Sequence, residues 1–530
     1  MRNRIAISAA LLIILLGLYG TGAILLDEAR LKRLVAQHIE GDTGRRIEIR
    51  GDLRLRLFPG LRLEAEQVEL SGPRERSGPA LLEAELMEMQ VRLLPLLRGE
   101  MDAREVRLKG AAINLHASSD GSSTLTGLLT GDSGSETRMG WLSGPIEADD
   151  VLIRLSDDLG ERADSLEIEH VALEGFAPGE PMQFQFRGNV GQPPLFDELE
   201  VVGLLRPLDG GRFRLQDMHL EGSLENGHFL INMVGELDVR PGPPLSVSLE
   251  GGLLRINEHA FDASIQYTAF DRPYVNARLS SAFVDLDVAR IPALLAGEDG
   301  HREASKVIEA ARGMDFDLEV RADQVAQLGL VMRDLALQAQ GRDQQLRVDE
   351  LSAAVPGGQL TALGVFDLSD GDVASRLGFR VDADRLDELA RAVPLDWLPG
   401  GSGALSMSLS TQRDAGILQT EGEGAIELWA GEWAPLEHLL PRGLVPTPGP
   451  GFDFFSARVE LLQDRVRLQE FQMVREDLVV QGGLEIALPD RSLSGRLDLI
   501  GAEAVTPIGL SGSLLDPELQ WPLPSEAPGQ

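Results

Sequence analysis

IEIRGDLRLRLFPGLRL, residues 47–63, alternates apolar and charged side chains over most of its length. Successive side chains of a β-strand point to opposite faces of the sheet, so this pattern predicts strands with one apolar and one solvated face. The tripeptide Phe58-Pro59-Gly60 interrupts the alternation, and its Pro and Gly favour a turn. The stretch therefore predicts a strand, a turn and a second strand.

The same alternation recurs along the rest of the chain. Few of the recurring segments are apolar on both faces, whereas parallel sheets buried between helices carry continuous apolar runs. The chain also holds 58 Gly and 29 Pro, which suits a turn after each short strand. We therefore expect a mainly β protein with a long, twisted, mostly antiparallel sheet. The segments with this pattern are 87–93, 106–109, 151–155, 166–173, 182–187, 213–215, 245–249, 316–320, 377–381, 405–409, 466–468 and 493–499.

A few short helices are predicted between the strands. Leu31, Leu34, Val35 and Ile39 recur at three- and four-residue spacing, which predicts a leading helix before Gly41. Helical spacing or strong helix formers predict further helices at 288–296, 302–312, 382–393 and 436–440. The segment 118–140 is rich in Ser, Gly and Thr and is predicted to be a loop.

Residues 5–26 form an uncharged run of 22 residues, long enough to cross a bilayer as a helix. Arg2 and Arg4 precede the run and Asp27 and Glu28 follow it, so the positive-inside bias places residues 1–4 in the cytoplasm. The alternative interpretation is a cleaved signal peptide, for which the apolar run is unusually long. The apolar residues of the predicted anchor include Ile5, Leu11, Leu12, Ile13, Ile14, Leu15, Leu16 and Leu26.

Beyond the anchor we expect two β regions, 27–300 and 301–530, with no clear linker between them. The net charge of −35 disfavours binding to nucleic acid or to anionic headgroups over the general surface. The absence of Cys excludes disulfides, thiol nucleophiles and thiolate metal sites.

Motifs for chemistry are missing from the sequence. We find no phosphate-binding loop, no G-x-S-x-G elbow and no H-E-x-x-H sequence. The eight His residues are scattered without the short spacings that metal sites use. Asp149-Asp150 and Asp157-Asp158 flank a predicted strand and are interpreted as solvated turn residues. The sequence predicts a protein that is not an enzyme and has no metal and no cofactor.

Several stretches resemble the AsmA family. The first is TGRRIEIRGDLRLRLFPGLRL at 43–63, and the second is VRLLPLLRGE at 91–100. Shorter matches follow at 108–111 and at Asp120-Gly121, and the closing segments 479–484 and TPIGLSGSLLDP at 506–517 resemble the end of the family pattern. Ser122-Ser123-Thr124 departs from the pattern, because the family commonly has an Asn with an aromatic residue there.

The resemblance implies a bacterial inner-membrane protein with its bulk in the periplasm, whose sheet curls into an elongated apolar groove. It also implies transport of phospholipid toward the outer membrane, in support of outer-membrane integrity, with an outer-membrane protein as a further candidate partner. Acyl chains would occupy the apolar interior while charged headgroups stay in water. The residues predicted to line the groove are Leu53, Leu55, Leu57, Leu61, Leu63, Met87, Met89, Val91, Leu93, Val151, Ile153, Leu155, Phe184 and Phe186.

Alternation alone does not reveal what covers an apolar sheet face, so the same residues are equally suited to the core of a β-sandwich. Two other functions also stay open. A periplasmic assembly factor would bind strands of outer-membrane proteins at free sheet edges. A structural tether would bind neither lipid nor client polypeptide.

Overall fold

The computed structural model describes most of the chain beyond residue 27. The described residues are 28–56, 61–72, 80–98, 100–117, 124, 142, 144–157, 164–175, 180–188, 196, 198–208, 212–224, 229–240, 244–269, 272–289, 306–327, 329–369, 375–392, 400–414, 417–433, 451–501, 505–513 and 516–520.

Several sequence predictions fall outside these ranges. They are the anchor at 5–26, the Phe58-Pro59-Gly60 turn, the helix at 436–440 and, apart from Thr124, the loop at 118–140. Within the ranges that the structure covers, no helix is long and apolar enough to cross a membrane.

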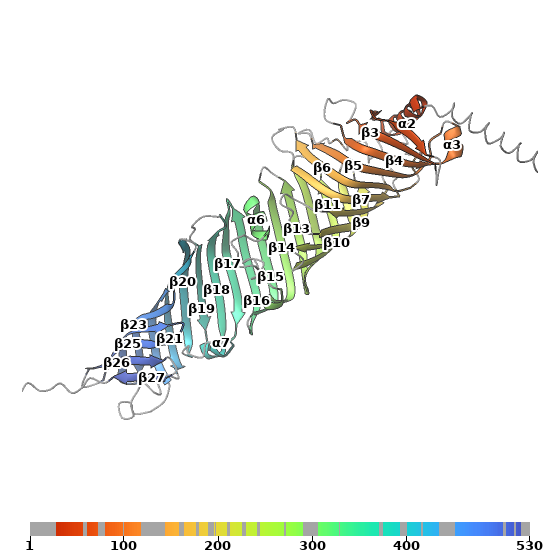
Figure 1. Cartoon of the computed structure of the whole chain (residues 1–530). Helices are drawn as coiled ribbons and strands as arrows, with labels where there is room; N and C mark the ends of the chain where they lie inside the picture. Colours follow the sequence, from red (N-terminus) through yellow and green to blue (C-terminus); the bar gives the residue numbers. More distant parts are fainter. Residues whose placement is uncertain are drawn as a thin grey trace, which may run out of the picture. The chain divides into compact units, whose positions relative to one another are not determined.

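The described fold is mainly β, and its strands are assigned to one mixed sheet. The chain divides into two compact units. Unit 1 comprises residues 1–257 and 264–271, and unit 2 comprises residues 258–263 and 272–530. Strand β13 (His259–Ala269) is therefore shared between them. Figure 1 shows the strands of each unit running side by side.

The described part of unit 1 begins with one helix and has a second short helix after its fourth strand. Its elements are α2 (Glu28–Thr43), β1 (Ile47–Ile49), β2 (Leu53–Arg56), β3 (Arg62–Leu70), β4 (Leu82–Val91), α3 (Leu93–Leu97), β5 (Ala103–Ala117), β6 (Ile146–Asp157), β7 (Asp164–Glu174), β8 (Met182–Gly188), β9 (Glu198–Pro207), β10 (Phe213–Leu224), β11 (Phe229–Arg240) and β12 (Leu245–Ile256).

The described part of unit 2 contains three short helices, which lie in the connections between strands. Its elements are β14 (Tyr274–Asp285), α4 (Leu286–Ala289), α6 (Lys306–Gly313), β15 (Asp315–Gln327), β16 (Leu330–Arg342), β17 (Gln345–Val355), β18 (Gly358–Asp367), β19 (Ser375–Ala383), α7 (Leu386–Ala392), β20 (Ser402–Asp414), β21 (Ile417–Glu432), β22 (Gly451–Leu462), β23 (Arg465–Arg475), β24 (Leu478–Ala487), β25 (Leu493–Ile500), β26 (Val505–Ser513) and β27 (Asp516–Gln520).

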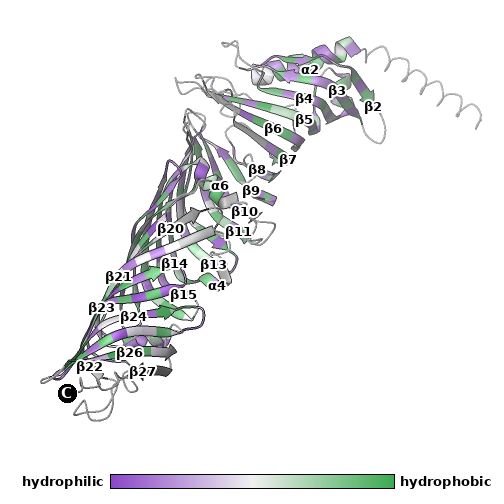
Figure 2. Ribbon diagram, turned by 60° about the vertical axis from the view of Figure 1, so that its left-hand side comes forward, coloured by the Kyte–Doolittle hydropathy of each residue, from purple (hydrophilic) through white to green (hydrophobic). Residues whose placement is uncertain are grey.

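Among the strand pairs that the structure describes, all but two are antiparallel, which confirms the prediction of a mostly antiparallel sheet. Strands β15 to β27 pair antiparallel, each with the next in the chain. The pairs β5–β6 and β14–β15 are parallel, which the sequence did not predict. Figure 2 shows hydrophobic and hydrophilic bands alternating along the strands, as the period of two requires.

The short helices agree with the sequence in part. Helix α2 confirms the predicted leading helix, α6 covers most of the helix predicted at 302–312, and α7 lies within 382–393. At 288–296 the described helix is only α4, which ends at Ala289. The strand predicted at 87–93 ends at Val91, and Leu93–Leu97 is the helix α3. Pro95 is tolerated there because the first turn of a helix needs no backbone N–H donors.

A first buried core lies where α2 packs on the opening strands of unit 1. Val35 of α2 and Leu63 and Met89 of the sheet are fully buried. Lys32 Nζ donates to the Gly51 carbonyl at 2.7 Å, and Glu28 Oε1 accepts from the Leu53 backbone N–H at 3.2 Å. These contacts fix α2 across the sheet, so this end of the apolar face is covered. We call this cluster the N-terminal core.

A second buried core lies between β21 and β26 of unit 2 and is built around aromatic rings. Phe455 and Phe471 are 1% and 2% exposed, and their ring centroids lie 5.3 Å apart in an edge-to-face arrangement. Trp433 packs on both rings, at 5.9 and 6.3 Å between centroids. Aromatic pairs in this geometry add stability beyond the area that they bury. We call this cluster the C-terminal core.

A buried polar cluster joins the edge of the N-terminal core to Thr124. The Asn114 side chain donates from Nδ2 to the Ala80 carbonyl at 2.7 Å and accepts from Arg154 Nη1 at 3.3 Å. Thr124 Oγ1 donates to the Asn114 carbonyl at 3.0 Å, and Arg45 Nη2 donates to the Thr124 carbonyl at 2.6 Å. Burial lowers the pKa of Arg45.

Asn114→Leu is expected to lower the free energy of unfolding by about 1–3 kcal/mol, because it leaves the buried Ala80 carbonyl without its donor. Urea unfolding measures the loss. Asn232→Leu is the control, since Asn232 makes a surface hydrogen bond to Glu221, and its loss is expected to stay within about 0.5 kcal/mol. Equal losses in the two variants would contradict the structural role of Asn114.

Candidate functional site

The residues that the sequence predicted for a lipid groove lie in the N-terminal core or against it. Leu57 and the side chains of Leu93 and Leu155 are outside the described residues. Lipid contact by the predicted groove residues stays a prediction, because their burial shows only that other parts of the protein cover them. Those that are buried are Leu53, Leu63, Met87, Met89, Val91, Val151 and Phe186, and those packed on them are Leu55, Leu61, Ile153 and Phe184.

A different stretch of the sheet carries apolar side chains that are only half-buried. It covers β15–β20 of unit 2, where paired residues form continuous rows across the strands. One row has Leu337 and Leu351 at its centre, and these two residues are direct cross-strand partners. The members of this row are Val320, Leu337, Leu351, Ala362, Phe379 and Met407. We call the surface made by this row and the next one the open apolar face.

The second row lies beside the first, two residues along each strand except β17, where a register shift makes the spacing three residues. Its members are Leu318, Ala339, Val348, Gly364, Leu377 and Leu409. Next to it the Phe316 ring leans over Gly341, where a β-carbon would lie 2.1 Å from the ring. Glycine at this position therefore lets a large ring lie flat on the neighbouring strand. Both rows consist of apolar residues and glycine only.

The burial of this face differs sharply from that of the C-terminal core. In the C-terminal core Leu428, Phe455 and Met473 are at most 1% exposed. On the open apolar face Leu337, Leu351 and Phe379 are all half-buried. Among the described residues of unit 2, the helices α4, α6 and α7 belong to connections between strands. The face is therefore apolar surface that the described part of the chain leaves partly in water.

Unit 1 has a comparable surface on β9–β12. Leu220 pairs with Val201 and with Met233, and Met233 pairs in turn with Leu254. A neighbouring row joins Leu205, Leu215, Leu237 and Leu249. Met233, Leu237 and Leu254 are half-buried, so this surface is also only partly covered within unit 1.

The opposite sheet face in β15–β20 carries ion pairs, although Leu363 and Val365 of β18 are also exposed on it. Arg380 pairs with Asp382 and Arg347 pairs with Asp349. The hydrogen bond from Arg380 lowers the pKa of Asp382, so this carboxylate stays ionised at neutral pH. Water contacts the charged face. Covering the open apolar face with an apolar ligand is favourable by about 25 cal/mol per Å² of apolar surface removed from water.

The acidic residues around β6 make local contacts. Asp149 Oδ1 lies 2.8 Å from His170 Nδ1 on the paired strand β7, and Asp150 has a positive φ of 53°. Asp149, Asp150 and Asp157 therefore belong to the strand instead of flanking it in turns, and Asp158 is outside the described residues. In the described parts of the chain no three His, Asp or Glu side chains form a metal-binding group.

Comparison with known proteins agrees with the resemblance found in the sequence. The AsmA family model matches residues 1–138. Protein AsmA of Escherichia coli strain K12 is 22% identical over 425 residues. This alignment covers 72% of the present chain and 65% of the length of that protein. No solved structure matches the chain.

Proposed function

Since the first 138 residues match the AsmA family and the rest of the sheet continues the same architecture, we propose that this chain is an envelope protein that carries lipid. The lipid acyl chains lie on the open apolar face, and the headgroup stays in water. The observation that carries this proposal is the pair of apolar rows across β15–β20, which carry no charge and are half-buried except at Ala339 and Gly364.

Acyl chains suit this surface because they need apolar contact but no hydrogen bonds. Each row presents a continuous strip of side chains from strand to strand, so a chain can shift along it without leaving apolar contact. A charged headgroup would pay several kcal/mol or more to enter such a surface, and it therefore remains at the border with water. Movement along the strip needs no chemical step, which agrees with a carrier that is not an enzyme.

The proposed topology follows from the sequence. Residues 5–26 anchor the chain in the inner membrane, residues 1–4 lie in the cytoplasm, and the β units lie in the periplasm. The sheet curls around its lipid cargo as a groove. Phospholipid then moves between the inner membrane and the outer membrane, where an outer-membrane protein is the proposed acceptor.

Photo-crosslinking in cells tests the proposal at adjacent residues on opposite sheet faces. A photoreactive amino acid is placed at Leu351 or Phe379 on the open apolar face, and at Ser352 or Arg380 on the other face. We expect phospholipid adducts, identified by mass spectrometry, at positions 351 and 379 only, because successive strand residues point in opposite directions.

Other adduct patterns separate the alternatives. Polypeptide adducts at these positions, without lipid, would support an assembly factor for outer-membrane proteins. Lipid adducts of equal yield at all four positions would indicate non-specific membrane contact and would contradict an apolar binding face. The absence of any adduct at positions 351 and 379 would contradict a lipid carrier and favour a structural tether.

A further inference from the structure

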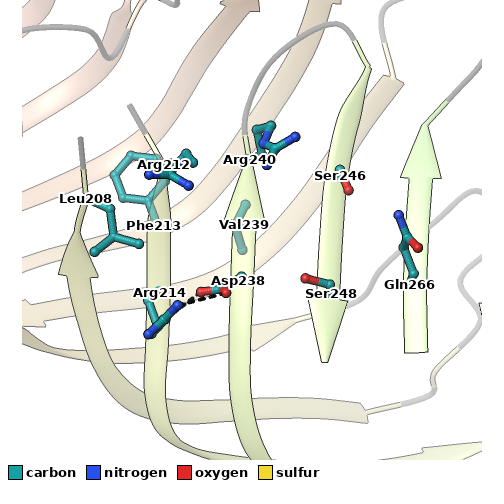
Figure 3. Close-up of a pocket in the computed structure, with 10 residues that line it drawn as sticks. All are labelled: Leu208, Arg212, Phe213, Arg214, Asp238, Val239, Arg240, Ser246, Ser248 and Gln266. Carbon is teal, nitrogen blue, oxygen red and sulfur yellow. Dashed lines mark hydrogen bonds and ion pairs between the residues drawn. The ribbon is translucent and has the colours of Figure 1, made fainter. Parts of the chain in front are cut away.

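A second site lies on the polar side of unit 1. It is a cavity of about 190 Å³ at the ends of strands β10–β12, lined by Arg212, Arg214, Arg240, Asp238, Leu208, Phe213, Val239, Ser246, Ser248 and Gln266. Figure 3 shows these residues on neighbouring strands, with Arg212 and Arg240 at the same end. Three guanidinium groups and one carboxylate meet here, in a chain whose overall charge is −35.

The site lies on the face opposite to the apolar rows of unit 1. Arg214 pairs with Asp238, and Asp238 pairs with Ser248, so their side chains share one face. Phe213 pairs with Val239 on the other face. The charged side chains of the cavity therefore lie on the face opposite to the apolar rows of unit 1, although Phe213 and Val239 also line the cavity.

Like charges lie side by side across the strands at this site and next to it. Arg214 is the direct cross-strand partner of Arg206 on β9, which lies outside the cavity lining. Arg212 precedes Phe213, the partner of Val239, so the register places Arg212 beside Arg240. Like charges directly opposite in a sheet are destabilising unless an anion lies between them. Within the cavity, the neighbouring Arg212 and Arg240 therefore favour a bound anion.

One carboxylate within the cavity offsets part of this charge. Asp238 receives two hydrogen bonds from Arg214, at 2.6 Å from Nε and 3.0 Å from Nη2. The hydrogen bond from Arg214 lowers the pKa of Asp238, which keeps the carboxylate ionised. Glu236 also acts on Arg214 from the same face of β11. These two hydrogen bonds fix the Arg214 guanidinium in the cavity. The positive charge of Arg240 has no carboxylate of its own among the cavity residues.

Further hydrogen-bond donors of the cavity are available to a ligand. Within the described residues, the side chains of Arg240, Ser246, Ser248 and Gln266 make no hydrogen bond or ion pair. A guanidinium with adjacent hydroxyl groups matches the tetrahedral oxygens of a phosphate, which accept several hydrogen bonds at once.

We propose that this cavity binds a phosphate group, held by Arg240 and Arg212 with Ser246 and Ser248 as further donors. The group is either the headgroup phosphate of a lipid or a soluble phosphate ester. The cavity volume of about 190 Å³ admits a phosphate with its first substituent. Binding here would add a polar contact point to a protein whose general surface repels anions.

Calorimetric titration of the full-length protein in neutral detergent with inorganic phosphate, at constant ionic strength, tests the site. We expect saturable binding in the unmodified protein, and Arg240→Gln is expected to weaken it by about tenfold or more, since a charged hydrogen bond is removed. Arg255→Gln is the matched control, because Arg255 is exposed on β12 of the same unit and lies outside the cavity. Both variants remove one positive charge.

Vesicles distinguish the two sources of phosphate. The protein is reconstituted in phosphatidylcholine vesicles, and separate phosphatidylglycerol vesicles are added while clustering is followed by light scattering. Clustering that is lost in Arg240→Gln and competed by inorganic phosphate supports a lipid headgroup. Phosphate binding without clustering supports a soluble ester. No saturable phosphate binding, or equal weakening in Arg240→Gln and Arg255→Gln, would overturn the proposal.

Discussion

Leu351→Glu is expected to abolish lipid binding to the open apolar face and to reproduce the outer-membrane permeability of a strain that lacks the protein. Leu351 lies between Leu337 and Ala362 in an uncharged row. A ligand chain covering this row would bury the new carboxylate without a cation, at a cost of several kcal/mol. Lipid adducts at a photoreactive residue 379 are therefore expected to fall at least about tenfold.

The variant should still fold, because Leu351 is half-buried and a carboxylate there can reach water in the empty protein. Ser352→Glu is the control, since it adds the same charge at the adjacent residue on the opposite face. It is expected to keep both lipid adducts and barrier function. A normal permeability barrier in cells that carry only Leu351→Glu would contradict a transport role for this face.

Phe455→Ala is expected to lower the free energy of unfolding of unit 2 by about 3–5 kcal/mol. The ring is 1% exposed and contacts Phe471 and Trp433 in the C-terminal core, so its removal leaves a cavity that the surrounding rings cannot fill. Urea unfolding of the full-length protein in detergent, followed by tryptophan fluorescence, measures the change, because Trp433 lies next to the altered ring.

Phe379→Ala provides the comparison, because Phe379 lies on the open apolar face and is half-buried. Its expected cost is below about 2 kcal/mol, since less apolar area is removed from contact. If the two variants lost the same stability, the open apolar face would have to be covered as completely as the C-terminal core.

The alternation of period two predicts strands well where one face is charged and the other apolar. All twelve further segments predicted from this pattern overlap strands of the structure, although 87–93 also enters α3. Strand β18 shows why others were missed. Its residues Leu363 and Val365 are 62% and 38% exposed on the face opposite to Leu360 and Phe366, so hydrophobicity does not alternate.

Bulges also obscure the pattern. The register shifts within β17 between Val348 and Leu351. The two residues both lie on the open apolar face but are three positions apart instead of two. The parallel pairs β5–β6 and β14–β15 could not be predicted either. A strand that is solvated on one face shows the same alternation whether its neighbour runs parallel or antiparallel to it.

The candidate site was harder to predict than the sheet. The residues chosen from the sequence have the right alternation, but α2 covers the strands on which many of them lie. Leu337 and Leu351 have the same chemistry but are only half-buried. Coverage depends on the arrangement of whole elements, which local sequence does not encode. The arginine pairs of unit 1 were missed because their residues come from separate strands.

The order of the strands also bears on how the protein folds. From β15 to β27 each strand pairs with the one synthesised immediately before it, so most contacts join residues close in sequence. Contacts of this kind need little loop closure and form quickly. We expect folding to advance hairpin by hairpin as the chain emerges, with the parallel pairs β5–β6 and β14–β15 as its slowest junctions.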